Sequence, residues 1–181
     1  MSAIGMVEVN SMPKGIEAGD AMLKAADVAL AAAQTACAGK YVVIVAGEVA
    51  AVKASVEAGK KAAAETLVDS IVIPNVDGQV ARAICACTEA RQGGALGIIE
   101  TFSLASAIIS ADYAVKAADI ELIEIRLGRG LGGKSFVTLT GEVSAARHAV
   151  EAARNAEETA GMVSRTVVIP SPHPDLMKEI Y

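Results

Sequence analysis

The chain has 181 residues, enough for one ordinary domain or two small ones. Hydrophobic residues make up 53% of it but aromatic residues only 3%, so the apolar mass is Ala, Val and Ile, which suits thin, closely packed layers. A net charge of −5 without a basic patch argues against nucleic-acid binding, and the absence of a long apolar run or a basic leader argues against a membrane partner, so we expect a cytoplasmic protein.

The first half of the chain predicts a strand, a helix, a two-stranded hairpin, a second helix and a last strand. Pro13 near the start of the first helix costs no hydrogen bond there, and Gly39 supplies the positive φ that a tight hairpin loop needs. Pro74 ends the last strand. The expected bounds are Ile4–Val9, Met12–Ala26, Val28–Thr35, Tyr41–Ala46, Glu48–Leu67 and Val68–Ile73, followed by a short helix over Gln79–Ala90 and a linker over Arg91–Gly94.

The second half of the chain repeats the first. Ala3–Val28 aligns without a gap with Ala95–Ile120 at an offset of 92, with identical residues at ten of 26 positions. The offset becomes 94 where Gly39-Lys40 matches Gly133-Lys134, and 96 where Ile73-Pro74 matches Ile169-Pro170. The first shift therefore falls in the hairpin loop, where an insertion is tolerated best.

The order β-α-β-β-α-β in each copy is that of the ferredoxin-like, or split βαβ, fold. Helices would cover one face of each sheet. The sequence therefore predicts an α/β protein of two tandem ferredoxin-like α/β-sandwich domains, with the first domain over residues 1–90 and the second over residues 95–181.

A single cysteine, Cys37, lies between two alanines at the tip of the first hairpin. A lone cysteine is most often a small buried hydrophobe. The alternative is a thiol aimed at a ligand, which requires several copies of the loop to converge. The other cysteines are Cys85 and Cys87, and an odd count in an intracellular chain argues against a disulfide framework.

The segment Gly128–Ser135 matches the phosphate-binding pattern G-x-x-x-x-G-K-S. That pattern needs a strand before it and a helix after it, because the helix N-terminus supplies the amides that bind phosphate. The strand Ile120–Arg126 is expected, but the following Phe136–Thr140 alternates as a second strand does. We therefore reject nucleotide binding. The repeat aligns this glycine-rich loop with the Cys37 hairpin, so if copies of that hairpin converge on a central axis, we expect the glycine-rich loop to lie near the same axis. Arg129 would bring positive charge to that centre.

The remaining candidate metal ligands show no metal-ligand spacing. Cys85 and Cys87 are expected on one helix, where positions i and i+2 point to different faces, so they are interpreted as packing residues. His148 is expected to be solvated on a helix, and His173 to lie in an extended tail. Glu8 and Asp20 recur as Glu100 and Asp112, which favours a structural role over acid–base chemistry.

The repeat resembles the shell-protein domain of bacterial microcompartments. The resemblance covers nearly the whole chain, is specific as a set and keeps an unpermuted order. The residues that carry it are Ala3–Glu8, Ala18–Val28 and Gly47–Val49 in the first copy, and Ala95–Glu100, Ala111–Asp119 and Gly141–Val143 in the second.

The resemblance implies a structural protein and not an enzyme. Two fused domains per chain imply a homotrimer that imitates a six-domain hexagonal tile of the shell, in contact with other shell proteins. The context Cys37-Ala38-Gly39-Lys40 is similar to that of tandem-domain, trimeric (T-type) members from propanediol-utilisation microcompartments. In these, three symmetry-related cysteines hold a [4Fe-4S] cluster.

The implied metal ligand is Cys37, with one [4Fe-4S] cluster per trimer. The function that the resemblance implies is electron transfer across the shell, or cluster delivery to encapsulated redox enzymes. An alternative is a shell protein whose central pore passes a small metabolite without a cluster. The residues expected around the centre are Ala36, Cys37, Ala38, Gly39, Gly128, Arg129, Gly130, Leu131 and Gly132.

The resemblance also implies a tile-edge role for Lys24 and Lys116, which occupy the same place in the two copies. Family members carry Pro-Arg-Pro-His near this edge, whereas this chain has Pro170-Ser171-Pro172-His173 and Pro74-Asn75-Val76-Asp77. Neither segment has the Arg that helps to lock tiles together. We therefore expect edge contacts that are either weaker or tuned to a particular neighbour.

Overall fold

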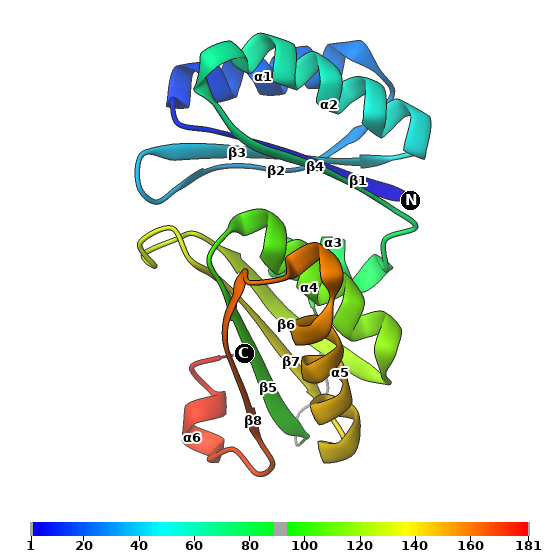
Figure 1. Ribbon diagram of the computed structural model, residues 1–181, viewed down its shortest axis with the longest axis vertical. Helices are drawn as coiled ribbons and strands as arrows, with labels where there is room; N and C mark the ends of the chain where they lie inside the picture. Colours follow the sequence, from blue (N-terminus) through cyan, green and yellow to red (C-terminus); the bar gives the residue numbers. More distant parts are fainter. Residues whose placement is uncertain (1, 89–93, 181) are drawn as a thin grey trace. The chain divides into compact units, whose positions relative to one another are not determined.

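The computed structural model describes residues 2–88 and 94–180, which divide into two units (Figure 1). The first unit comprises the chain up to Ala81 together with the loop Gly128–Gly133, and the second comprises Arg82–Leu127 and the chain from Lys134 onward. The expected linker residues 91–93 lie outside the described residues. Within the described residues, no helix combines the length and apolar character that a membrane crossing requires.

The first unit is one antiparallel sheet with two helices on one face (Figure 1). The strand order is β2-β3-β1-β4, so the central strands are the first and third in sequence. The elements are β1 (Ala3–Val9), α1 (Met12–Ala25), β2 (Ala29–Ala36), β3 (Lys40–Gly47), α2 (Val49–Ala63), the 3₁₀ turn η1 (Ala64–Thr66) and β4 (Leu67–Pro74).

The second unit repeats this arrangement with strand order β6-β7-β5-β8, and its helices α4 and α5 also share one face of the sheet (Figure 1). Its elements are β5 (Ala95–Thr101), α4 (Leu104–Ala117), β6 (Ile120–Leu127), β7 (Ser135–Gly141), α5 (Val143–Asn155), the 3₁₀ turn η2 (Glu157–Thr159) and β8 (Val163–Ile169). The predicted fold class, two tandem split βαβ sandwiches, is confirmed.

Glycine in the central strand lets a helix approach each sheet closely. A β-carbon on Gly5 would lie 2.5 Å from Val56 Cγ2 and 2.7 Å from Val52 Cγ1, both on α2. A β-carbon on Gly97, the equivalent residue of the second copy, would lie 2.5 Å from Leu139 Cδ1 and 3.1 Å from Val150 Cγ2. Both glycines therefore leave no room for a side chain, which would meet α2 in the first unit and mainly Leu139 of β7, with α5 next, in the second.

The second helix ends earlier than the expected Leu67. Its last residue is Ala63, and Ala64, the first residue of the turn η1, has φ = 50°, which interrupts the α-helix. Leu67 instead opens β4, where it pairs with Val9 of β1. Pairing in the sheet therefore overrides the helix-favouring composition of this segment.

A short helix follows each copy, and both segments differ from expectation. Helix α3 covers Gly78–Ile84, so the prediction of a helix up to residue 90 is wrong for residues 85–88. Residues 89–90 lie outside the described part of the chain. The Thr88 hydroxyl donates to the Ile123 carbonyl at 2.6 Å, which holds this segment against β6. His173 is extended, as expected, but the helix α6 (Pro174–Met177) begins at the next residue.

We expect Gly5→Ala and Gly97→Ala each to destabilise the protein by about 1–3 kcal/mol, because the added methyl group overpacks the layer between sheet and helices. Chemical denaturation monitored by circular dichroism measures the change. Gly47→Ala is the matched control, since its β-carbon would meet no atom closer than 3.4 Å. An equal loss of stability in all three variants would contradict the packing role of Gly5 and Gly97.

Candidate functional site at the hairpin loops

Cys37 lies at the tip of the hairpin between β2 and β3. The last strand pair is Ala36 with Lys40, so Cys37, Ala38 and Gly39 form the turn. Gly39 has φ = 73°, which confirms the predicted need for glycine at this position. Ala36 is buried, Cys37 is half-buried, and Ala38 and Gly39 are exposed, so the thiol sits at the boundary between sheet and solvent.

The glycine-rich loop of the second copy contacts Cys37 directly. The loop leaves β6 at Leu127 and rejoins β7 at Ser135, and its residues Gly128–Gly133 group with the first unit. The Cys37 amide donates to the Gly128 carbonyl at 2.9 Å, and the Gly130 amide donates to Cys37 Sγ at 3.2 Å. The structure therefore brings Cys37 together with Gly128 and Gly130, and the position of these loops at a central axis stays a prediction.

The space beside these hydrogen bonds is open. A β-carbon built on Gly39, Gly130 or Gly132 would meet no atom within 4 Å. Gly130 and Gly132 have φ values of 71° and 61°, conformations that other residues rarely adopt. The loop thus combines a backbone that requires glycine with room for a bulky group next to a thiol.

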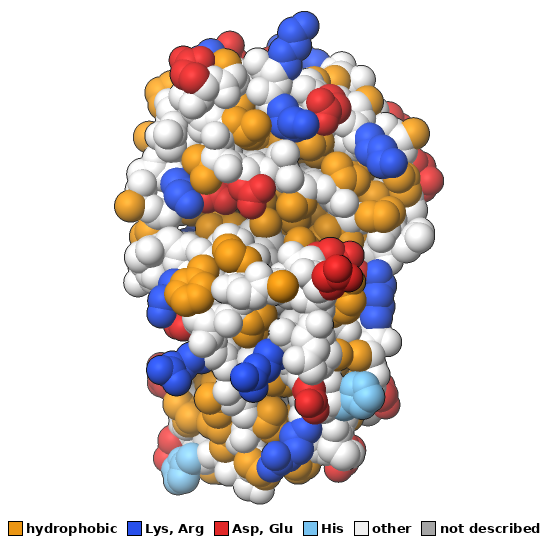
Figure 2. Space-filling model, in the orientation of Figure 1, with side chains coloured by type: hydrophobic (Ala, Val, Ile, Leu, Met, Phe, Trp, Pro, Cys, Tyr) orange, Lys and Arg blue, Asp and Glu red, His pale blue; other side chains and the backbone are white. Residues whose placement is uncertain are grey.

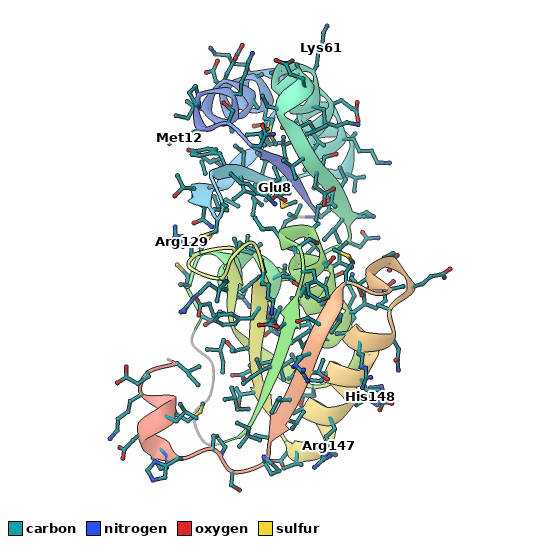
Figure 3. The ribbon with its side chains drawn as sticks, turned by 60° about the vertical axis from the view of Figure 1, so that its left-hand side comes forward. Glu8, Met12, Lys61, Arg129, Arg147 and His148 are labelled. Atoms are coloured by element: carbon teal, nitrogen blue, oxygen red, sulfur yellow. The ribbon has the colours of Figure 1, made fainter. Side chains whose placement is uncertain are left out.

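Arg129 brings a positive charge to this loop. Its guanidinium donates to the side-chain oxygen of Gln34 on β2, and Figure 3 shows the residue at the end of the loop. Arg129 and Gly132 are exposed, and Leu131 is half-buried. On the face of the molecule in Figure 2, Lys and Arg side chains are scattered among Asp and Glu.

The segment that matches the phosphate-binding motif is not followed by the helix that such a motif requires. The strand β7 follows Lys134 directly. The Lys134 ammonium lies 3.0 Å from Glu100 Oε2. The Ser164 hydroxyl, and then Lys134, hold the pKa of the Glu100 carboxyl below its usual range. Both the strand that follows the loop and the ion pair of Lys134 with Glu100 agree with the prediction that this segment is not a phosphate-binding loop.

The same ion pair occurs in the first copy, where Lys40 Nζ lies 2.7 Å from Glu8 Oε1. Lys40 and Lys134 each follow the hairpin loop, and Glu8 and Glu100 each lie on the central strand. The sequence contained a signal for this pair, since both members recur in the repeat, but sequence reasoning did not connect them.

The interpretation of Cys85 and Cys87 as helical packing residues is wrong. Both side chains are exposed, and both lie beyond the end of α3 in a turn where Ala86 has φ = 52°. The Cys87 thiol donates to the Cys85 carbonyl at 3.3 Å, and burial, with a smaller contribution from Cys87, raises the pKa of the Cys85 thiol.

No group of three His, Cys, Asp or Glu side chains suited to a metal ion occurs within residues 2–88 and 94–180. His148 is exposed on α5, as predicted (Figure 3). The His173 side chain has a local hydrogen-bond partner, because its Nδ1 accepts a hydrogen bond from the Asp175 amide at 3.2 Å.

Lys24 and Lys116 lie in the last turns of α1 and α4. Each pairs with the aspartate four residues earlier, Lys24 with Asp20 at 2.6 Å and Lys116 with Asp112 at 2.5 Å. The orientation, acid first and base last, suits the helix dipole. The two lysine side chains remain 74% and 46% exposed, so both are accessible to a neighbouring molecule.

We expect no magnesium-dependent ATP binding by the protein, and no change on Lys134→Ala, because the loop leads into a strand and its lysine pairs with Glu100. Isothermal titration calorimetry of both proteins measures this. Tight ATP binding that Lys134→Ala abolishes would contradict the assignment.

Comparison with known proteins identifies a family and relatives that share this architecture. The family model "BMC domain" matches the chain twice, over residues 3–76 and 95–172. The bacterial microcompartment shell protein PduT of Citrobacter freundii is 39% identical over 178 residues, covering 98% of this chain and 97% of PduT. The crystal structure of a microcompartments protein from Desulfitobacterium hafniense DCB superimposes with a TM-score of 0.94 at 53% identity, covering 98% of this chain and 99% of that one.

A fused permuted hexameric shell protein from the RMM microcompartment gives a TM-score of 0.61 at 25% identity, covering 84% of this chain and 81% of that one. Two matched domains, a relative similar along nearly its whole length and the same fold in a solved microcompartment protein agree with one another. The chain belongs to the BMC-domain family and is a structural shell protein of bacterial microcompartments with two tandem domains.

Proposed function

We propose that three copies of this chain assemble into a pseudohexameric tile whose centre holds one [4Fe-4S] cluster through Cys37. The tile would carry electrons across the shell or deliver clusters to encapsulated redox enzymes. Three chains with two BMC domains each supply the six domains of a hexagonal tile, and identical chains close such a ring by head-to-tail contacts.

The observation that carries the proposal is the hydrogen bond from the Gly130 amide to Cys37 Sγ, at 3.2 Å. Iron–sulfur clusters are held by cysteine thiolates, and hydrogen bonds to the sulfur atoms set their reduction potentials. One thiol per chain becomes three on a threefold axis. The fourth iron then takes a ligand from outside the three chains.

The neighbours of Cys37 suit such a ligand. Ala36 and Ala38 offer no competing donor, and the open positions at Gly39, Gly130 and Gly132 leave room for a bulky inorganic group. The Arg129 charge offsets negative charge at the centre. When bound, the cluster supplies one-electron chemistry; the chain supplies the thiolate, the amide and the charge.

We expect Cys37→Ala and Cys37→Ser to give folded, colourless trimers without iron, because each removes the only thiol in the hairpin turn. Iron per trimer after anaerobic reconstitution is the measured quantity, and it should be about four for the wild-type protein. Cys85→Ser and Cys87→Ser are the matched controls. Both thiols belong to the segment held against β6, so the iron content should not change.

Two results would overturn this assignment. Iron retained by Cys37→Ala but lost by the Cys85 and Cys87 variants would move the site to the C-x-C pair. A wild-type trimer that takes up no iron would leave the rival function, a central pore that passes a small metabolite. A monomer by light scattering would contradict the trimer itself.

The second expectation concerns Lys24 and Lys116 as tile-edge residues. Charge reversal in Lys24→Asp/Lys116→Asp should abolish extended sheets seen by electron microscopy, while light scattering still reports a trimer. Each reversal also breaks an ion pair with the preceding aspartate. Lys61→Asp, at the exposed end of α2, is the charge-matched control and should leave the sheets intact (Figure 3). Sheets of wild-type extent from the double variant would remove the edge assignment.

A further inference from the structure

Helix α1 carries an exposed apolar stripe on the side away from its own sheet. Met12, Ile16 and Leu23 are spaced by four and seven positions, so they share one side of the helix. They are 52%, 57% and 39% exposed (Figure 3). The buried side of the same helix holds small residues and a methionine: Gly15, Ala18, Gly19 and Met22. The α1 stripe therefore needs an element from outside the first sheet to bury it.

The equivalent stripe of the second copy is closed. At the offset of 92, Leu104 and Ile108 of α4 stand where α1 has Met12 and Ile16. Both are fully buried. The duplicated helix thus has a closed copy and an open copy of one surface.

The outer faces of the two sheets, which lie opposite the helices, differ in the opposite sense. Gly5 faces α2, so its neighbour Met6 lies on the outer face of the first sheet, and Met6 is fully buried. Its equivalent in the second sheet, Ile98, is half-buried. Val42 of the first outer face is also fully buried, whereas its equivalent, Phe136, is half-buried.

The open part of the second outer face extends over three strands. Val167 of β8 pairs with Ile98 of β5, and Phe136 of β7 pairs with Glu100, the next outward-facing residue of β5. Val167 is 49% exposed. Ile98, Phe136 and Val167 thus form an apolar patch of the kind that a second layer covers in a sandwich fold.

These two open patches are of different kinds, a helix stripe in the first unit and a sheet face in the second. A closed ring of identical chains needs two different patches on every chain, because its contacts are head-to-tail. We propose that the α1 stripe of one chain packs on the second outer face of another copy of this chain. This inference rests on the trimer proposed above and names the contact that closes it.

The charges beside the two patches are complementary. Asp20 follows Ile16 by four positions, so it lies beside the stripe, and its side chain is 60% exposed although it pairs with Lys24. The second sheet carries two exposed bases on its outer face at places where the first sheet is neutral or acidic: Arg126 for Gln34, and Arg165 for Asp69. An acid beside the stripe suits a face that has gained bases.

The test uses two variants, each of which destroys one patch. Ile16→Asp/Leu23→Asp puts charge into the stripe, and Phe136→Asp/Val167→Asp puts charge onto the sheet face. Each variant alone keeps only one patch, so light scattering should report a monomer. An equal mixture should form a dimer, because the intact stripe of one variant binds the intact face of the other and the ring cannot close.

The control carries the same chemical change at a distance from both patches. Lys53→Asp/Lys61→Asp places two carboxylates at exposed positions of α2 and should still give a trimer. Circular dichroism of every variant checks that it is folded.

A second measurement does not depend on the folding of these variants. Unlabelled chains with p-benzoylphenylalanine in place of Ile16 are assembled with ¹⁵N-labelled wild-type chains, irradiated and digested with trypsin. The probe then lies in the peptide Gly15–Lys24, and the second outer face lies in part in Ser135–Arg147 and Thr166–Lys178. We expect the unlabelled probe peptide to be linked to one of these two labelled peptides. The same probe in place of Lys61 should give neither product.

The outcomes separate this inference from the trimer. A trimer from either patch variant, a mixture of folded variants that stays monomeric, or a cross-link that joins another peptide or lies within one chain overturns the inference alone. If a patch variant is unfolded, the cross-link decides. A wild-type monomer by light scattering overturns the trimer and the inference together.

Discussion

The ion pair between Glu8 and Lys40, at the base of the first hairpin loop, stabilises the turn on which the candidate site depends. Glu8 lies on the central strand with a side chain only 2% exposed, and Lys40 reaches it at 2.7 Å. A buried carboxylate needs a partner, and removing one member of such a pair costs about 3–5 kcal/mol. Lys40 is therefore held at the start of β3, where it pairs with Ala36 of β2, and Cys37, Ala38 and Gly39 form the turn between them.

The second copy keeps this ion pair in a more exposed form and changes the loop beside it. Lys134 pairs with Glu100 as Lys40 pairs with Glu8, but the loop before it runs from Gly128 to Gly133 and carries no thiol. The longer loop reaches Cys37 with its backbone, through the Gly128 carbonyl and the Gly130 amide. Duplication thus supplied two copies of one scaffold, and divergence in a single loop made one the thiol donor and the other the amide donor. The resemblance to a phosphate loop follows from glycines and a lysine that serve this different purpose.

The short helices after the two domains show that local sequence sets the hydrogen bond at the helix start, whereas tertiary context sets the burial of the helix. The capping hydrogen bond from residue i+2 occurs in both, with Asp77 in one and His173 in the other, because it depends only on residues within the segment. Burial does not follow from that bond. Val80 is fully buried and Leu176 is 47% exposed, although both occupy the same helical position. What covers a helix is decided by the elements packed against it, and these differ between the two copies.

The sequence by itself determined the duplication, the split βαβ order of each copy, the position of Cys37 beside Gly39 and the absence of a helix after Lys134. These rest on periodicity, turn residues and repeat offsets, which are local properties of the chain. Only the tertiary structure decided that α2 ends at Ala63, because Leu67 is required in the sheet opposite Val9. It also decided that Cys85 and Cys87 lie exposed beyond α3, where Thr88 binds β6, and that Gly130 donates to the sulfur of Cys37. Each of these depends on a partner distant in sequence, and a pattern read along the chain carries no information about which distant residue will arrive.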